Sequence, residues 1–269
     1  MINATEKRPQ NERMMSVPQT VSKQELLISL RDLSELETLK GARIKTPTYI
    51  DFKEPNLGSL GATKPEIWHQ VARWRDSPAN AECLSGVSLS VALGSFSTAL
   101  SNIDSLPDCF DFAKFGPEGV GGGVQGIRRL AEAWDACRAI LIERSTDLVA
   151  VAYADHQKAA CPPVRQVVEA AIRSGVERVL IDTFTKCGRT CLDFISLEEL
   201  RLIQDDLPNG WWALAGGLKV SDIEYIRTEG IHPSCLAFRG AVCSRGRTSS
   251  FDALRYGDLL SVFSRTSWT

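Results

Sequence analysis

The stretch Thr46–Ala62, TPTYIDFKEPNLGSLGA, is the part of the chain around which the rest is organised. Within it a short apolar strand, YIDFK, is followed by a loop rich in proline and glycine. Side chains at positions i and i+2 of a strand share a face, so Asp51 and Lys53 point one way while Ile50 and Phe52 point the other. An acid and a lysine therefore lie side by side at the end of a strand. A strand-end lysine is often simply solvated. The residues at the other strand ends must therefore decide whether Lys53 is a solvated surface lysine or part of a site.

The pattern of an apolar strand followed by an amphipathic helix repeats through the chain. Strands are expected in the segments ELLISLRD, YIDFK, GVSLSVALG, CFDFAKFG, DLVAVAYAD, ERVLIDT, WWALAGG and SCLAFRG. Helices are expected over 34–39, 65–76, 98–103, 124–143, 164–173, 197–206, 222–229 and 251–263. Apolar strands without strict alternation indicate a parallel sheet covered by helices, and eight such repeats predict a single (β/α)8 TIM barrel. The competing doubly wound sheet usually has a glycine-rich turn after its first strand, and LRDLSE has no glycine.

Composition narrows the function classes. The chain has 269 residues and a formal net charge of -2, which favours neither a nucleic-acid nor a membrane-surface partner. No apolar run approaches the roughly 20 residues of a membrane span, and the first residues lack the apolar core of a secretory signal, so a cytoplasmic location is expected. Residues 1–22 are polar and aperiodic and are predicted to be a flexible extension, with residues 23–269 forming the catalytic barrel.

The cysteines and histidines do not have the spacing of a metal site. The chain contains eight cysteines and three histidines, with no CxxC motif and no paired Cys/His set. We therefore expect reduced cysteines, no metal and no organic cofactor.

Polar residues and glycines gather at the predicted strand ends, where active sites of such barrels lie. Besides Asp51 and Lys53, these positions hold Lys114, Asp155, Asp182, Lys186, Gly216, Gly217, Arg239 and Gly240. Each of these residues also has a purely structural interpretation. Asp155 and Asp182 could cap the following helices or pair with barrel lysines, and Gly216 and Gly217 could simply form a turn. Three lysines and three aspartates meeting at one mouth nevertheless favour a site.

This set of residue types suits carbonyl chemistry on a phosphorylated substrate. Crowded ammonium groups lower the pKa of the least solvated lysine, and a neutral amine attacks a carbonyl to form a Schiff base. A second lysine or an aspartate can then move protons at carbon. The last two strand loops, LAGG and FRGAVCSRGR, offer backbone N–H groups and arginines for phosphate.

The same segments resemble a known family. DFKEPNLGSLGA, DFAKFG, YAD, IDTFTKCGRTCLDF, ALAGGL and FRGAVCSRGR are similar, in order and spacing, to (5-formylfuran-3-yl)methyl phosphate synthase, a barrel enzyme of methanofuran and methylofuran biosynthesis. The resemblance runs from about Glu25 to the carboxyl terminus. It implies a lyase that condenses two molecules of glyceraldehyde 3-phosphate, with loss of phosphate and water, through a lysine Schiff base.

The resemblance also implies roles for individual residues. Lys53 would be the Schiff-base lysine and Lys114 the proton acceptor, with Asp51, Asp182 and Lys186 in supporting positions; Asp155, Gly216, Gly217, Arg239 and Gly240 would bind substrate or phosphate. The expected partner is a triose phosphate, and a homo-oligomer is compatible with the sequence. Gly217 and the run Phe115–Pro117 depart from the usual family pattern. Both departures affect substrate binding, and so the choice of substrate.

Two alternatives stay open from the sequence. A Schiff-base aldolase for another phosphosugar would share Lys53 and Lys114 but would release no inorganic phosphate. A catalytically silent phosphosugar-binding barrel would need neither lysine.

Overall fold

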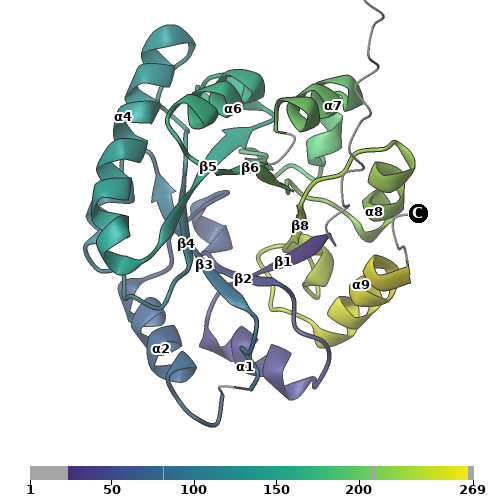
Figure 1. Cartoon of the computed structure of the whole chain (residues 1–269). Coiled ribbons are helices and arrows are strands. Elements are labelled where there is room, and N and C mark those ends of the chain that lie inside the picture. Colours follow the sequence, from purple (N-terminus) through teal and green to yellow (C-terminus); the bar gives the residue numbers. More distant parts are fainter. Residues whose placement is uncertain (1–23, 81, 208–209, 266–269) are drawn as a thin grey trace, which may run out of the picture.

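Eight parallel strands form a closed barrel in the computed structural model of the chain, which describes residues 24–80, 82–207 and 210–265. The strands follow one another around the barrel in chain order, at the centre of Figure 1. Their bounds are β1 Glu25–Leu30, β2 Tyr49–Phe52, β3 Ser88–Ser95, β4 Phe112–Gly116, β5 Asp147–Tyr153, β6 Arg178–Asp182, β7 Trp211–Leu214 and β8 Cys235–Phe238. The predicted (β/α)8 barrel is confirmed.

Helices surround the barrel, as Figure 1 shows. They are α1 Leu33–Gly41, α2 Pro65–Arg75, α3 Ala99–Ile103, α4 Gly123–Leu141, α5 His156–Ala159, α6 Val164–Arg173, α7 Leu197–Asp206, α8 Val220–Thr228 and α9 Ala253–Arg265. Helix α5 was not predicted, because four residues are too few to show a helical period. The flexible extension predicted for residues 1–22 lies outside the described residues.

Local signals fix where the helices begin. The Asp32 carboxylate accepts a hydrogen bond from the Glu35 N–H at 3.1 Å at the start of α1, and Ser196 does the same for the Glu199 N–H at 3.1 Å at the start of α7. These caps satisfy amide groups that the first helical turn cannot pair.

Strand β2 shows how the sequence pattern builds two different environments. Ile50 and Phe52 are fully buried between the barrel and its helices, whereas Tyr49 and Asp51 face the barrel interior. The register aligns Asp51 with Ser29 of β1 and Ser90 of β3, so a layer of polar side chains crosses the inside of the barrel.

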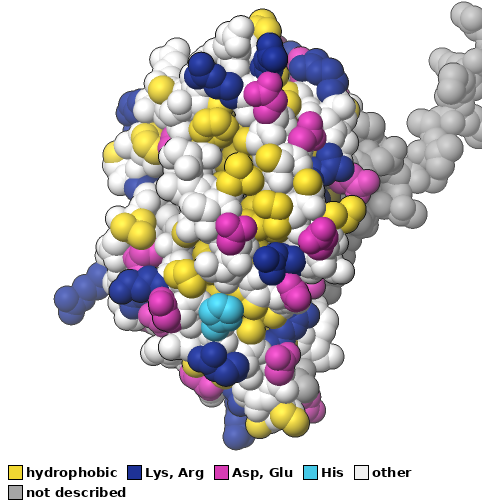
Figure 2. Space-filling model, turned by 90° about the vertical axis from the view of Figure 1, so that its left-hand side faces the viewer, with side chains coloured by type: hydrophobic (Ala, Val, Ile, Leu, Met, Phe, Trp, Pro, Cys, Tyr) yellow, Lys and Arg dark blue, Asp and Glu magenta, His cyan; other side chains and the backbone are white. Residues whose placement is uncertain are grey.

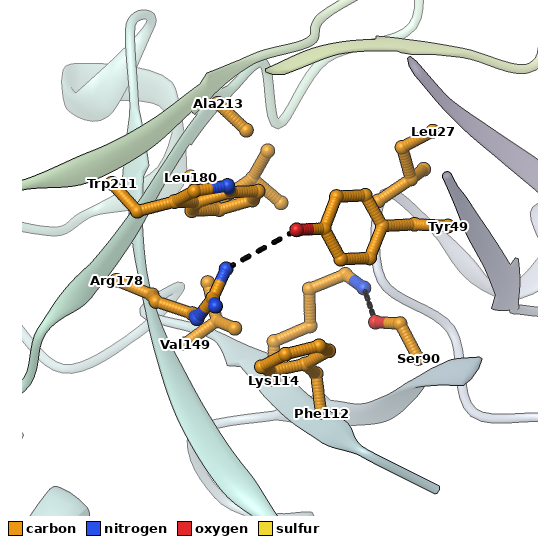
Figure 3. A pocket seen from close by; sticks show the side chains of 10 residues that line it. All are labelled: Leu27, Tyr49, Ser90, Phe112, Lys114, Val149, Arg178, Leu180, Trp211 and Ala213. Atoms are coloured by element: carbon orange, nitrogen blue, oxygen red, sulfur yellow. Dashed lines mark hydrogen bonds between the residues drawn. The ribbon is translucent and has the colours of Figure 1, made fainter. Parts of the chain in front are cut away.

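An aromatic layer fills the amino-terminal end of the barrel, shown in Figure 3. The Arg178 guanidinium carbon lies 4.3 Å from the Phe112 ring centroid and 4.8 Å from that of Trp211. The Tyr49 hydroxyl donates to Glu25 at 2.9 Å and the Trp211 indole N–H donates to the same carboxylate at 2.6 Å. The small cavity that remains, about 20 Å³, has room for about one water molecule and none for a substrate. The interior at this end of the barrel is therefore filled by side chains.

The outer surface carries both signs of charge. Figure 2 shows the side of the molecule on which α2 and α4 lie, with Lys and Arg interspersed among Asp, Glu and apolar side chains. Across the described part of the chain, no helix is both long and apolar enough to cross a bilayer.

Candidate active site

Asp51 and Lys114 form a buried ion pair inside the barrel. The Lys114 ammonium donates to Asp51 Oδ1 and to the Ser90 hydroxyl, the latter at 2.6 Å, and the Ser29 hydroxyl donates to Asp51 Oδ2 at 3.0 Å. Both charged side chains are at least 97% buried. Each charge thus has a partner and further hydrogen bonds, as burial of charge requires.

Lys53 stands one step nearer the mouth on the same face of β2. Among residues 24–80, 82–207 and 210–265 no group lies within hydrogen-bond or ion-pair distance of its Nζ, although the residue is only 9% exposed. Burial lowers the pKa of Lys53 to about 8; the charges of Asp182 and Asp51 oppose the change, and those of Lys186 and Lys114 add to it. A lysine with this pKa is a neutral nucleophile in part at neutral pH.

Asp182 and Lys186 form a second ion pair at the end of β6. The Lys186 ammonium donates to Asp182 Oδ1 at 2.8 Å and to the Thr183 hydroxyl at 3.1 Å, and the Ser59 hydroxyl lies 3.0 Å from Asp182 Oδ2. Burial disfavours the Asp182 carboxylate, but Lys186 and Lys53 outweigh it and lower its pKa to about 2. Asp182 is therefore a fixed negative charge beside Lys53.

Asp155 holds the loop that carries Lys186. Its two carboxylate oxygens accept hydrogen bonds from the Phe184 N–H at 2.7 Å and the Thr185 N–H at 2.8 Å. Although burial opposes ionisation, these bonds lower the pKa of Asp155. Asp155 occupies the position before α5 but its side chain does not cap that helix. The structure thus ties Asp155 to loop shape rather than to a helix end.

The loop after β2 is fastened across the mouth. The Arg247 guanidinium donates to the carbonyls of Pro55 and Gly58, both at 2.6 Å, and the Ser59 hydroxyl is 2.8 Å from the Thr183 carbonyl. These contacts join the loop to the ends of β8 and β6. They also help to explain why Lys53 is shielded from bulk water.

The glycines after β7 and β8 lie in the loops at the mouth, where Gly216 is buried and Gly217 is exposed. Gly216 and Gly217 have φ angles of 86° and 72°, and a Cβ on Gly216 would lie 2.8 Å from the Cys191 Cβ. Within the described ranges, the N–H groups of Gly216, Gly217 and Gly240 have no protein acceptor. Backbone amides in glycine turns can bind anions when they have no protein acceptor, so these loops suit a phosphate group.

Arg239 has a different task from the expected phosphate contact. Its guanidinium donates to both carboxylate oxygens of Glu35, to the Arg247 and Ser29 carbonyls at 3.0 and 3.1 Å, and to the Ser249 carbonyl at 2.9 Å. All five donors are used, and the side chain is 95% buried. These contacts join the β8 end to α1 and leave no guanidinium donor for a phosphate.

Sequence reasoning missed the serines of the site. Ser29 and Ser90 lie at strand positions that face inward with Asp51, so the strand period was a signal for them. Ser59 comes from a loop and reaches across the barrel, for which the sequence holds no local signal. Groups of three or more Cys, His, Asp or Glu side chains able to hold a metal ion are absent from the part of the chain that the structure describes.

Solved structures share the fold. Phosphoribosyl anthranilate isomerase from Thermococcus kodakaraensis matches with a TM-score of 0.57 at 14% identity, covering 90% of this chain and 100% of that one. Thiamine phosphate pyrophosphorylase from Pyrococcus furiosus matches with a TM-score of 0.55 at 13% identity, covering 90% and 96%. At these identities the likeness concerns the barrel alone.

Sequence relatives are more specific. Proteins named (5-formylfuran-3-yl)methyl phosphate synthase are 25% identical in Methanococcus maripaludis strain C5, over 82% of this chain and 90% of the relative, and 29% identical in Methanopyrus kandleri, over 73% and 81%. The relative from Methanosarcina acetivorans is 26% identical over 82% and 90%. The family model described as 4-HFC-P synthase matches residues 26–258, a span that contains the strands of the barrel except Glu25, the first residue of β1, and all the site residues described above. The chain therefore belongs to the 4-HFC-P synthase family, as the strand-end motifs predicted.

Proposed function

We propose that this protein is a lyase that condenses two molecules of glyceraldehyde 3-phosphate to (5-formylfuran-3-yl)methyl phosphate, releasing phosphate and water, through an imine on Lys53. The observation that carries the proposal is the state of Lys53, which is buried, has no partner for its Nζ in the described structure, and has a pKa of about 8. Family membership supports the product. The proposed place of the reaction is the cytoplasmic biosynthesis of a methanofuran-type cofactor.

The first step forms the imine. The neutral Lys53 amine attacks the aldehyde carbon of a triose phosphate, and the carbinolamine loses its hydroxyl as water. Lys114 is suited to supply the proton for that water, because its ammonium is held in place by Asp51 and Ser90. The Lys114 amine left behind can then accept the proton from the carbon next to the imine.

Fixed charges assist this step. Asp182 is ionised and lies close enough to Lys53 for each charge to shift the other's pKa, so it favours the cationic iminium that forms there. Lys186 balances the Asp182 charge, and Asp155 fixes the loop from which Lys186 projects.

The phosphate of the substrate is assigned to backbone groups. The free amides of Gly216, Gly217 and Gly240 lie in the last two strand loops, where barrels of this kind commonly bind phosphate. Since the Arg239 donors are all used, the backbone and not that side chain would make the contact.

A direct assay tests the proposal. Purified protein incubated with glyceraldehyde 3-phosphate should produce furan absorbance and release inorganic phosphate in equal amounts, and Lys53→Met should produce neither. Lys64→Met, at an exposed lysine just after the β2 loop, is the matched control and should behave like the wild type. Carbon–carbon bond formation without phosphate release would instead identify a Schiff-base aldolase, and binding without turnover a silent phosphosugar-binding barrel.

A further inference from the structure

A carboxyl–phenol pair stands at the β4–β5 side of the mouth and has no part in the steps above. The Tyr153 hydroxyl donates to Glu118 Oε2 at 3.2 Å. Tyr153 is the last residue of β5 and is fully buried, and Glu118 is the second residue after β4 and is half-buried. The pair is therefore held at two neighbouring strand ends, where catalytic groups of barrels lie.

Gly116 makes room for this pair. It lies two residues beyond Lys114 on the same face of β4, so its missing side chain would point toward the mouth. A Cβ there would lie 2.0 Å from Glu118 Oε2 and 2.3 Å from the Tyr153 hydroxyl oxygen. The φ angle of Gly116 is not positive, so space and not backbone conformation requires glycine. Glu118 and Tyr153 therefore occupy the space that a side chain at position 116 would fill.

The pair is continuous with the lysine site. The register of β5 with β6 places Tyr153 beside Asp182, and the Ser59 hydroxyl lies next to both side chains. Tyr153 keeps its proton, because burial first and then the charges of Glu118 and Asp182 raise its pKa well above the ordinary value. It is therefore a lasting hydrogen-bond donor to Glu118.

The surroundings of Glu118 favour its protonated form. Burial raises the pKa of Glu118, and its own N–H and the Tyr153 hydroxyl only partly oppose this. The titratable groups that face it are Tyr153 and the Cys161 thiol, whose own pKa is raised to about 12 by burial and then by the Glu118 and Asp155 charges. Among the residues that the structure describes, no cation is a cause of the pKa shift of Glu118, in contrast to Asp182.

We propose that Glu118, positioned by Tyr153 and admitted by Gly116, donates the proton to the hydroxyl group that the second triose loses as water. This inference rests on the proposed function. The neighbouring carbon gives a proton to water, and the electron pair of that C–H bond forms a carbon–carbon double bond. The carbon–oxygen bond breaks with its electron pair on oxygen, the Glu118 carboxyl proton joins that oxygen, and water leaves. The carboxylate left behind is stabilised by the Tyr153 hydrogen bond and takes up a proton from solvent. In the closed barrel three strands separate β4 from β8 on either side, so this pair lies across the mouth from the β8 loop to which the phosphate is assigned.

Three variants test the assignment. Glu118→Gln should keep the borohydride adduct on Lys53 at the wild-type level, while furan formation falls by about 10²- to 10⁴-fold, the range for a lost general acid. Gly116→Ala keeps both acids but fills their space, so it should also keep the adduct on Lys53 while furan formation falls. Tyr153→Phe should give a smaller loss in kcat. Glu143→Gln, an exposed glutamate at the opposite end of the barrel, is the control and should be unaffected.

The pH profile adds a signature that a structural role would not produce. The wild-type kcat should fall on the alkaline side as Glu118 loses its proton, and this limb should be missing in Glu118→Gln. A Glu118→Gln enzyme with wild-type kcat, or one that loses adduct and furan together, would overturn the inference. If the wild-type enzyme itself forms an adduct but no furan, the proposed function has failed. This result differs from failure of the Glu118 assignment, in which the wild type makes furan.

Discussion

Replacing Lys53 with methionine should make the protein more stable at neutral pH while abolishing its activity. Burial moves the pKa of Lys53 from its ordinary value of 10.5 to about 8. Below pH 8 the lysine is charged in both the folded and the unfolded chain, so folding must bury an ammonium group that has no direct partner. The difference in pKa corresponds to about 3 kcal/mol of unfolding free energy. Lys53→Met should recover up to that amount at pH 7, less whatever Asp182 loses when its neighbouring charge disappears.

The sign of the pH dependence is fixed by proton counting. Between pH 8 and 10.5 the unfolded chain holds the Lys53 proton and the folded chain does not, so the contribution of this residue to stability rises with pH. The advantage of Lys53→Met should therefore be largest at pH 7 and should shrink as the pH approaches 10.

Urea unfolding of the wild type, Lys53→Met and the exposed control Lys64→Met at pH 7 and pH 9.5 measures this directly. The unfolding midpoint of Lys53→Met should lie above that of the wild type at pH 7 and approach it at pH 9.5, with Lys64→Met unchanged at both. A Lys53→Met protein that is less stable than the wild type at pH 7, or whose advantage does not depend on pH, would show that the Lys53 charge is not buried at a cost. The reasoning about its nucleophilicity would then fail too.

Further outcomes follow from the same geometry. Borohydride added with glyceraldehyde 3-phosphate should leave its mass adduct on the peptide that contains Lys53, and an adduct confined to Lys114 or Lys186 would refute the assignment of the nucleophile. Lys114→Ala should still form the adduct, but more slowly, because water must then supply the proton that Lys114 gives to the leaving hydroxyl. It should also need a more alkaline pH, because loss of one ammonium and of the partner of Asp51 both raise the pKa of Lys53; an unchanged pH dependence would mean that the two lysines do not interact. Arg239→Ala should lower stability by up to about 3–5 kcal/mol, since it leaves the buried Glu35 carboxylate with Arg31, 4.0 Å away, as its remaining cation; a raised KM with unchanged urea midpoint would return Arg239 to the phosphate site. Activity should survive dialysis against EDTA, and restoration by one divalent ion after a loss would call for a metal-assisted mechanism.

The sequence was sufficient to predict the barrel and the positions of Lys53 and Lys114 at its strand ends, because both depend on strand position alone. The i, i+2 rule places Asp51 and Lys53 on the inward face of β2, and the last residue of an apolar strand marks Asp182. Lys114, two residues before the end of β4, follows from the same rule.

Arg239 shows where such reasoning ends. From the sequence it is a strand-end arginine followed by glycine, and such residues commonly bind phosphate. Its actual partner, Glu35, lies 204 residues away on α1, and both charges are buried. Whether a strand-end cation faces a substrate or a carboxylate depends on helix packing, which strand periodicity does not report. For the same reason Glu118, in a glycine-rich loop, could not be distinguished from a solvated residue before its contact with Tyr153 was known.

The aromatic layer at the amino-terminal end of the barrel also determines what spectroscopy can detect. Trp211 is stacked on Arg178 and hydrogen-bonded to Glu25, on the far side of Lys114 from the mouth. Its fluorescence should therefore follow the opening of the barrel and be insensitive to a triose phosphate arriving at the strand ends. A change in Trp211 emission on substrate addition, with the other tryptophans replaced, would reveal that the two ends of the barrel are mechanically coupled.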